Sequence, residues 1–262
     1  MTASTNGSAR RLRVAFVGKG GSGKSAIAGT FARLLARAGH TVLAIDSDPM
    51  PGLAYSVGVT LTDLGIPEDA VVERAEGEEG PRFRLRPDLS VAEAVDAYAT
   101  RGPDGVRFLQ FTKVGGALTG QMRSQQAFLQ IVHDLPDDRW SIVGDLPGGT
   151  RQPFYGWGRY ADTYLVVVEP SAKGILSARR LARLARPGDE QGRVRVVLNK
   201  VRDGDDVDRV AARIGLPVVG VVPWDEELAE AERQGRPPVD DAPDSPAVGA
   251  VASLLATLTE GR

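Results

Sequence analysis

The chain has 262 residues with 34 acidic and 32 basic side chains, so its formal net charge is only −2. This balance gives no global attraction to nucleic acid or to an anionic membrane, and a hydrophobic content of 42% can fill the core of a large α/β domain. The absence of cysteine excludes disulfides, iron–sulfur clusters and thiolate metal sites, and two histidines argue against a multi-histidine site.

The first ten residues are polar and small, and no run in the chain approaches the roughly 18 apolar residues of a membrane-spanning helix. We therefore expect residues 1–10 to form a flexible tail and residues 11–262 to form one domain, because no linker or repeat divides them. The same pattern predicts a soluble, cytoplasmic protein without a transmembrane segment.

Short, almost continuously apolar runs alternate with helical patterns along the chain. The expected strands are Leu12–Val17, Thr41–Ile45, Val106–Phe111, Trp140–Val143, Tyr164–Val168, Val194–Leu198 and Val218–Val222. The expected helices are Lys24–Ala38, Val91–Tyr98, Ala172–Ala185, Asp206–Ile214 and Ala247–Thr259. Strands that are apolar throughout are typical of a parallel sheet with helices on both faces. The alternation therefore predicts an α/β fold with a doubly wound, mostly parallel sheet.

A glycine-rich segment follows the first expected strand and opens the first expected helix. It fits the pattern G-x-x-x-x-G-K-[ST], in which glycines let backbone N–H groups curl around phosphate oxygens at a helix N-terminus. The residues expected to bind nucleotide here are Gly18, Lys19, Gly20, Gly21, Ser22, Gly23, Lys24 and Ser25. Lys24 would bridge the β- and γ-phosphates of a nucleotide, and the Ser25 hydroxyl would hold Mg²⁺.

A second lysine, Lys19, stands inside this loop, although 27 of the 32 basic residues in the chain are arginine. The segment K-G-G-x-G-K-S resembles the deviant Walker A ATPases, the class that contains MinD, ParA, ArsA, the nitrogenase iron protein and the CooC-like ATPases. The resemblance implies a P-loop NTPase fold that binds ATP with Mg²⁺ and forms a homodimer. It also implies a catalytic role for Lys19, which would reach the partner's nucleotide and neutralise charge on the transferring phosphoryl group.

Two acidic segments follow later strands, at the edge where an open α/β sheet places its ligand groups. In the first, D-S-D-P, the resemblance implies that Asp48 orients the attacking water and that Asp46 supports the magnesium shell. The alternative is an Asx turn that only closes the strand. In the second, D-L-P-G-G, it implies that Asp145 contacts Mg²⁺ through a water and that the Gly149 N–H senses the γ-phosphate.

The base of the nucleotide is expected to lie against residues at the ends of the last two strands. Asn199 and Lys200 offer an amide and an aliphatic stem that can bind and cover a purine ring. Guanine readers also place an aspartate two residues after the lysine, where this chain has Arg202, so adenine is favoured over guanine. Pro223 and the residues after it match the place where this class closes over the base.

The resemblance extends from about Arg13 to Leu258 and is strongest to the CooC-like members, through A-I-D-x-D-P and the V-V-E-P-S segment at Val167–Ser171. Those proteins carry a C-x-C pair before the second acidic segment, where this chain has VGGALTGQMRSQQ at Val114–Gln126. The missing cysteines do not affect the fold or the ATPase activity that the resemblance implies. They exclude the binding of nickel through thiolates.

Weaker features have two interpretations each. An aromatic run could grip a partner or, more simply, pack the following helix; it consists of Phe154, Tyr155, Trp157 and Tyr160, with Arg151 beside it. An arginine stripe could contact nucleic acid or be a solvated helix face; it consists of Arg179, Arg183 and Arg186. The C-terminal helix lacks the basic face of a membrane-targeting helix.

The sequence thus predicts an Mg-ATP-dependent dimerising ATPase that acts as a nucleotide-controlled switch on an unidentified client protein. The alternatives are a partition or positioning ATPase that binds DNA or a membrane, a metallocentre maturation ATPase with non-thiolate ligands, and a module that binds ATP without hydrolysing it.

Overall fold

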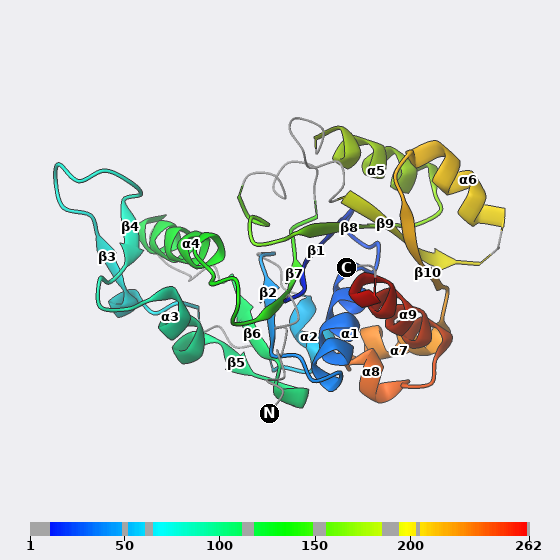
Figure 1. Ribbon diagram of the computed structural model, residues 1–262, viewed down its shortest axis with the longest axis horizontal. Helices are drawn as coiled ribbons and strands as arrows, with labels where there is room; N and C mark the ends of the chain where they lie inside the picture. Colours follow the sequence, from blue (N-terminus) through cyan, green and yellow to red (C-terminus); the bar gives the residue numbers. More distant parts are fainter. Residues whose placement is uncertain are drawn as a thin grey trace, which may run out of the picture.

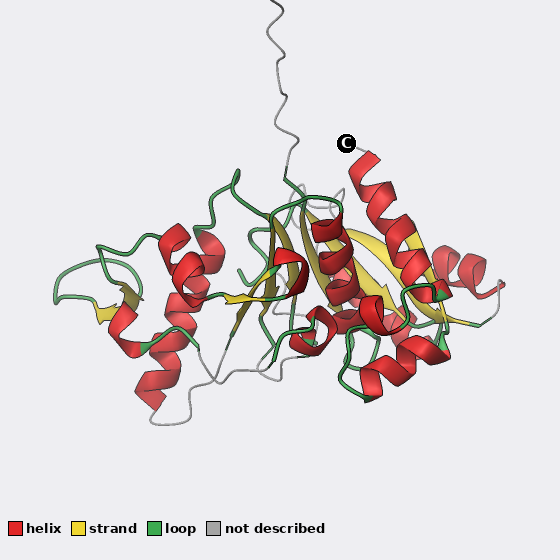
Figure 2. Ribbon diagram, turned by 90° about the horizontal axis from the view of Figure 1, so that it is seen from below, coloured by secondary structure: helices red, strands yellow, loops and turns green. Residues whose placement is uncertain are grey.

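A twisted, mostly parallel sheet forms the centre of the molecule in the computed structural model, with helices on both of its sides (Figures 1 and 2). The structure describes residues 11–48, 52–60, 65–111, 118–148, 156–184, 194–202 and 205–260. The ten-residue tail expected at the N-terminus lies outside these ranges. Within them, no helix combines the length and the apolar character needed to cross a membrane.

The main sheet has the strand order β10-β9-β8-β1-β7-β2-β6-β5 within the described residues. Its strands are β1 Arg13–Gly18, β2 Val42–Asp46, β5 Thr100–Arg101, β6 Arg107–Gln110, β7 Ser141–Asp145, β8 Thr163–Val168, β9 Val194–Val201 and β10 Val218–Pro223. Neighbours are parallel except for β5 and β6, which are antiparallel. A second, antiparallel sheet pairs β3 Val71–Glu73 with β4 Phe83–Leu85.

The helices cover the sheet through two separate apolar cores. The α-helices are α1 Lys24–Arg37, α2 Leu53–Val57, α3 Val91–Tyr98, α4 Leu118–His133, α5 Ala172–Leu184, α6 Asp205–Ile214, α7 Glu226–Arg233, α8 Pro238–Asp241 and α9 Pro246–Glu260, and short 3₁₀ turns lie at Glu68–Ala70 and Pro103–Gly105. Helices α1 and α9 supply one core, where the Phe16 and Phe31 rings meet edge to face at 5.6 Å. Helices α4, α5 and α6 supply the other. Both faces of the sheet are therefore buried, which explains its continuously apolar strands.

The strands predicted from sequence are all present, with ends that differ by at most three residues. The largest difference is in β9, which continues to Val201, so Asn199 and Lys200 lie inside the strand and not after it. Helices α2, α4, α7 and α8, strand β5 and the small sheet were not predicted. Helix α4 packs against β4 and α3 in a lobe beside the main sheet, which appears on the left of Figure 1.

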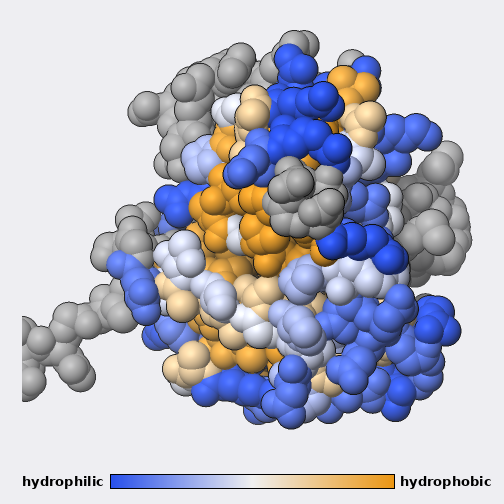
Figure 3. Space-filling model, turned by 90° about the vertical axis from the view of Figure 1, so that its right-hand side faces the viewer, coloured by the Kyte–Doolittle hydropathy of each residue, from blue (hydrophilic) through white to orange (hydrophobic). Residues whose placement is uncertain are grey.

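The edge of the main sheet at strand β10 is apolar. Strand β10 and helix α9 form an open groove there of about 570 Å³, in which the Val221 side chain is 38% exposed. Figure 3 shows apolar side chains along this face of the molecule.

Candidate nucleotide-binding site

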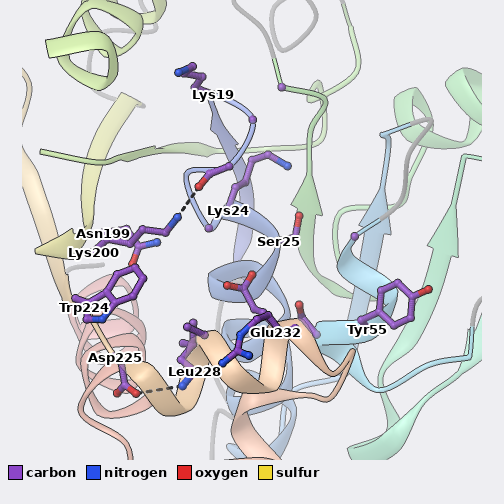
Figure 4. Close-up of a pocket in the computed structure, with 18 of the residues that line it drawn as sticks. Lys19, Lys24, Ser25, Tyr55, Asn199, Lys200, Trp224, Asp225, Leu228 and Glu232 are labelled. Carbon is purple, nitrogen blue, oxygen red and sulfur yellow. Dashed lines mark hydrogen bonds between the residues drawn. The ribbon is translucent and has the colours of Figure 1, made fainter. Parts of the chain in front are cut away.

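A cavity of about 720 Å³ opens at the carboxyl ends of the parallel strands (Figure 4). Its wall includes the glycine-rich loop, Asp48, Tyr55 of α2, Asn199 and Lys200 of β9, and parts of the segment from Pro223 to Arg236. The volume lies within the range of pockets that enclose small ligands. The sheet thus brings together segments that are nearly 200 residues apart in the chain.

The glycine-rich loop between β1 and α1 has a backbone that only glycine adopts without strain. Gly21 and Gly23 have φ angles of +84° and +81°, and Gly23 is the N-cap of α1. A β-carbon on Gly23 would lie 2.3 Å from Nδ2 of Asn199, and one on Gly18 would lie 2.7 Å from the carbonyl oxygen of Val167. The predicted loop therefore needs glycine for its conformation and for close packing against β8 and β9.

Buried charges meet at the start of α1. The Lys24 ammonium forms an ion pair with Asp145 at the end of β7, and the Ser25 hydroxyl donates a hydrogen bond to the same carboxylate. Burial raises the pKa of Asp145, while Lys24 acts in the opposite direction. Asp46 lies opposite Asp145 in the register of β2 and β7. Burial, together with the charge of Asp145, raises the pKa of Asp46 to about 7.

This donor set fits a magnesium ion. Mg²⁺ prefers hard oxygen ligands, and a hydroxyl oxygen and a carboxylate lie side by side at Ser25 and Asp145. Two buried carboxylates share the single ammonium of Lys24, so a further cation would balance the local charge. Among the described residues, no three His, Asp or Glu side chains are grouped to hold a metal on their own, so phosphate and water oxygens would complete the shell.

Asp46 organises the loop that follows β2. Its Oδ1 accepts a hydrogen bond of 3.0 Å from the backbone N–H of Asp48, which is the Asx turn considered as an alternative from the sequence. Its Oδ2 accepts from the N–H groups of Gly52 and Leu53, at 3.1 and 3.0 Å, where α2 begins. Asp46 thus fixes the backbone beside Asp48, and its role in the magnesium shell stays a prediction.

The two lysines of the loop point in different directions. The Lys24 side chain is 8% exposed and faces Asp145. The Lys19 side chain is exposed and points away from Lys24 in Figure 4. Within the described part of the chain, the Lys19 ammonium forms no hydrogen bond or ion pair, and it is open to a neighbouring molecule.

Asn199 and Lys200 brace the loop from β9. Nδ2 of Asn199 donates to the carbonyl oxygen of Ser22 at 2.7 Å, and Nζ of Lys200 donates to that of Gly21 at 2.6 Å. Lys200 has a φ angle of +61° and also pairs with Glu169 at 2.9 Å. Their predicted contacts with a base stay predictions. The sequence did not identify Glu169 as the ion-pair partner of Lys200, although Glu169 lies in the V-V-E-P-S segment noted from the sequence.

The segment after Pro223 closes one end of the cavity. Trp224 lines it, and helix α7 begins at the N-cap Asp225, whose Oδ1 accepts from the N–H groups of Glu227 and Leu228 at 2.9 and 3.1 Å. Glu232, on the same helix, extends into the cavity in Figure 4, where the surrounding protein raises the pKa of its carboxyl. The sequence pattern predicted Pro223 and the segment after it, but it did not identify Trp224, Asp225 or Glu232.

Several predicted residues lie outside the described ranges: Pro49, Gly149, Arg151, Phe154, Tyr155 and Arg186, as does the side chain of Arg183. Trp157 and Tyr160 are described and buried, at 9% and 4% exposure, and the Trp157 ring packs against Phe111 at 5.4 Å. Packing therefore accounts for these two aromatic residues. Arg179 is exposed on α5.

Comparison with known proteins identifies one family. Residues 14–239 match the family model described as the CobQ/CobB/MinD/ParA nucleotide binding domain. The chain is 29% identical to an uncharacterised ATP-binding protein of Methanocaldococcus jannaschii, over 86% of this chain and 90% of the relative. It is 28% identical to the carbon monoxide dehydrogenase accessory protein CooC of Rhodospirillum rubrum, over 86% and 88%.

Solved structures confirm the fold. The MinD cell division ATPase of Pyrococcus furiosus superposes with a TM-score of 0.70 at 18% identity, covering 95% of this chain and 99% of that one. MinD of Pyrococcus horikoshii in complex with Mg-ADP superposes with a TM-score of 0.68 at 15% identity, covering 93% and 94%. The predicted P-loop fold and the predicted resemblance to MinD, ParA and CooC proteins are both confirmed.

Proposed function

The chain belongs to the family of CobQ/CobB/MinD/ParA nucleotide-binding domains, and from this premise we propose that it is an Mg-ATP-dependent ATPase whose dimer acts as a switch on a partner protein. The observation that carries the proposal is the buried cluster of Lys24, Ser25 and Asp145 at the start of α1. It joins a cation that would bind phosphate to a hydroxyl and a carboxylate that would hold Mg²⁺, beside a glycine-rich loop whose backbone N–H groups would bind phosphate oxygens.

Binding would exchange one partner of Lys24 for another. In the structure, the Lys24 ammonium pairs with Asp145. With ATP in the loop, the ammonium would contact the β- and γ-phosphates, and Ser25 and Asp145 would hold Mg²⁺, Asp145 through a water. The metal would supply positive charge to the phosphate oxygens. The Gly149 N–H, by the same proposal, would meet the γ-phosphate.

Hydrolysis would need one further group to orient water. Asp48 lines the cavity, and its backbone N–H is held by Asp46 at 3.0 Å, so its position is set by β2. We assign Asp48 to orient the water that attacks the γ-phosphorus, which gives ADP and inorganic phosphate in one displacement without a covalent intermediate.

Lys19 supports a dimer with shared sites. Its exposed ammonium lies at the mouth of the cavity without a partner among the described residues, and a second subunit's triphosphate would pair with it. Partner proteins also occur among the structural neighbours, one of which is a MinC:MinD cell division protein complex of Aquifex aeolicus. A client bound in the ATP state and released after hydrolysis would be the output of the switch.

The test measures both ATP hydrolysis and the oligomeric state of the protein. Purified protein should release phosphate from ATP with Mg²⁺, and light scattering should report a dimer with ATP and a monomer without it. Asp48→Ala should keep the ATP dimer and lose hydrolysis. Lys19→Ala should lose both, while Arg213→Ala, which removes an exposed cation of α6, should lose neither.

Two of the alternatives would be identified by results of their own. ATP binding without phosphate release by the wild type would identify a sensing module. A DNA mobility shift that requires ATP, or binding to anionic vesicles, would identify a positioning ATPase. Absence of nucleotide binding would overturn the proposal.

A further inference from the structure

Strand β9 contains a local bulge at Asn199 and Lys200. Leu198 and Val201 of β9 are three residues apart, but they pair with residues of β10 that are only two apart. Lys200, inside this bulge, has a left-handed backbone with a φ angle of +61°. A residue other than glycine is uncommon in this conformation, and such residues cluster at functional sites. Bulges also serve to turn a side chain in a new direction.

The bulge brings two successive side chains to the same loop. In a regular strand they would point to opposite faces. Here Nδ2 of Asn199 donates to the carbonyl oxygen of Ser22 at 2.7 Å, and Nζ of Lys200 donates to that of Gly21 at 2.6 Å (Figure 4). The C=O and N–H of a trans peptide point in opposite directions, so each held carbonyl directs the N–H of its own peptide away from the bulge. In the Gly21 peptide, this N–H belongs to Ser22 and closes a turn onto the carbonyl oxygen of Lys19 at 3.1 Å.

Glu169 fixes the Lys200 side chain in this orientation. It comes directly after β8, which is a parallel neighbour of β9. Its carboxylate accepts from Nζ of Lys200 at 2.9 Å, and the two side chains are 37% and 31% exposed. A lysine side chain is long and flexible, so a partner that holds its ammonium limits the rotamers it adopts. Glu169 also balances the charge of this ammonium, which is already engaged with the Gly21 carbonyl.

We propose that the bulge clamps the glycine-rich loop, and that Lys200 and Glu169 are positioning residues for phosphate binding. This inference rests on the proposed ATP-binding function. Backbone N–H groups bind a phosphate more tightly when their peptides are oriented in advance, and the clamp orients two successive peptides of the loop. The strained backbone of Lys200 is retained because a regular strand would turn its ammonium to the other face of the sheet. In this scheme Lys200 and Glu169 act through the loop and do not touch the nucleotide.

Calorimetric titration with ADP and with inorganic tripolyphosphate shows which part of a nucleotide depends on Lys200. Lys200→Met keeps an unbranched side chain but removes the ammonium, so it should raise the Kd for both ligands by the same factor, about tenfold. Lys200→Arg keeps a cationic donor and should recover most of the lost affinity. Lys173→Met removes an exposed lysine of α5 that is not part of the cavity wall, and it should change neither Kd.

Glu169→Gln tests whether the carboxylate acts through Lys200. It leaves the ammonium in place but less firmly held, so the Kd for tripolyphosphate should rise about threefold. If Lys200 bound a phosphate itself, removal of the competing carboxylate would lower this Kd, and that result would overturn the inference. Glu169→Gln combined with Lys200→Met should bind no more weakly than Lys200→Met alone, because Glu169 then has no ammonium to hold.

Unfolding in urea separates positioning from a purely structural role. Lys200→Gly removes the ammonium together with the strain, so its urea midpoint should exceed that of Lys200→Met while its Kd for tripolyphosphate stays equally high. Affinity that recovered along with stability in Lys200→Gly would assign Lys200 a structural role and overturn the inference. A loss confined to ADP would assign Lys200 to the base and overturn it too.

Two further results separate this inference from the proposed function. Unchanged Kd values for both ligands in Lys200→Met would overturn the clamp while the proposed function stands. A wild-type protein that binds neither ADP nor tripolyphosphate would overturn the proposed function itself.

Discussion

The two ends of the cavity are built in different ways. The end proposed to bind phosphate, here called the phosphate end, is one continuous segment, Gly18–Ser25, which offers backbone N–H groups and a buried ammonium beside Asp145. The base end is assembled from β9, β10 and α7, and its groups are side chains held by neighbours, such as the Trp224 ring in front of Arg202. We therefore expect changes at the phosphate end to abolish catalysis and changes at the base end to alter affinity.

The largest effect is expected for Lys24→Met. It removes the cation that we propose to contact the transferring phosphate, so kcat should fall at least about a hundredfold. It also leaves Asp145 unpaired in a fully buried position, which should lower the free energy of unfolding by about 3 kcal/mol.

Asp145→Asn in the same chain should restore most of the lost stability but no hydrolysis, as measured by urea unfolding and phosphate release. Trp224→Ala is the base-end control, and it should raise KM more than it lowers kcat. Equal losses of kcat in Lys24→Met and Trp224→Ala would contradict the division of the cavity into two ends.

Glycine-to-alanine changes within the loop should differ sharply from one another. Gly23→Ala places a β-carbon 2.3 Å from Asn199 at a φ of +81°, so nucleotide binding should be lost. Gly21→Ala meets no neighbour but has a φ of +84°, which costs roughly 1–2 kcal/mol. Gly20→Ala has open space and no positive φ, so it should bind nucleotide nearly as wild type does.

Calorimetric titration with ADP would rank these three variants. Asn199→Ala combined with Gly23→Ala removes the clash but not the backbone strain, so it should recover part of the affinity. If Gly20→Ala were as damaging as Gly23→Ala, the loop would not have the conformation described.

The base end is anchored to the body of the protein by two arginines of α1. Arg33 and Arg37 both pair with Asp104 and with Asp240, the latter in α8 just after the cavity wall. Their side chains differ in burial, at 2% exposure for Arg33 and 39% for Arg37. Truncation of the buried Arg33 would leave a cavity and would remove the donor that the carbonyl oxygen of Val57 accepts from at 2.9 Å, whereas an exposed ion pair contributes about 1 kcal/mol or less.

Arg33→Ala should therefore destabilise the protein by several times more than Arg37→Ala, although each variant removes two ion pairs with the same two carboxylates. Urea unfolding monitored by circular dichroism would measure the difference. If the two variants lost similar amounts of unfolding free energy, burial would not determine how much each arginine contributes to stability.

The phosphate end could be predicted from sequence because its signals are local. The glycines, Lys24 and Ser25 stand at fixed spacing between an apolar run and a helical pattern, and Asp46 and Asp145 each end a recognisable strand. Backbone geometry in such a segment follows from the residues themselves.

The base end could not be predicted in the same way. Arg202 and Trp224 meet only because β9 and β10 are neighbours in the sheet, and nothing in the local pattern links them. Helix α7 has few apolar residues, so its periodicity is weak, and the N-cap Asp225 was its clearest signal. The buried position of Arg33 depends on partners that follow it by about 70 and 200 residues.

The smallest expected effect is a pH dependence at Glu232, which extends from α7 into the cavity. The surrounding protein raises the pKa of its carboxyl above the ordinary value of 4.5, with Lys200 acting in the opposite direction, while solvent still reaches the side chain. Between pH 4.5 and the raised pKa of Glu232, the folded chain binds more protons than the unfolded chain, so stability falls as pH rises through this window.

Glu232→Gln removes this contribution to the pH dependence of stability. Its free energy of unfolding relative to wild type should therefore increase from pH 4 to pH 7, whereas Glu227→Gln, on the same helix but not part of the cavity wall, should show no such increase. Urea titrations at several pH values would reveal the trend, and a Glu232→Gln difference that did not change with pH would place this carboxyl in ordinary solvent and separate it from the wall of the base end.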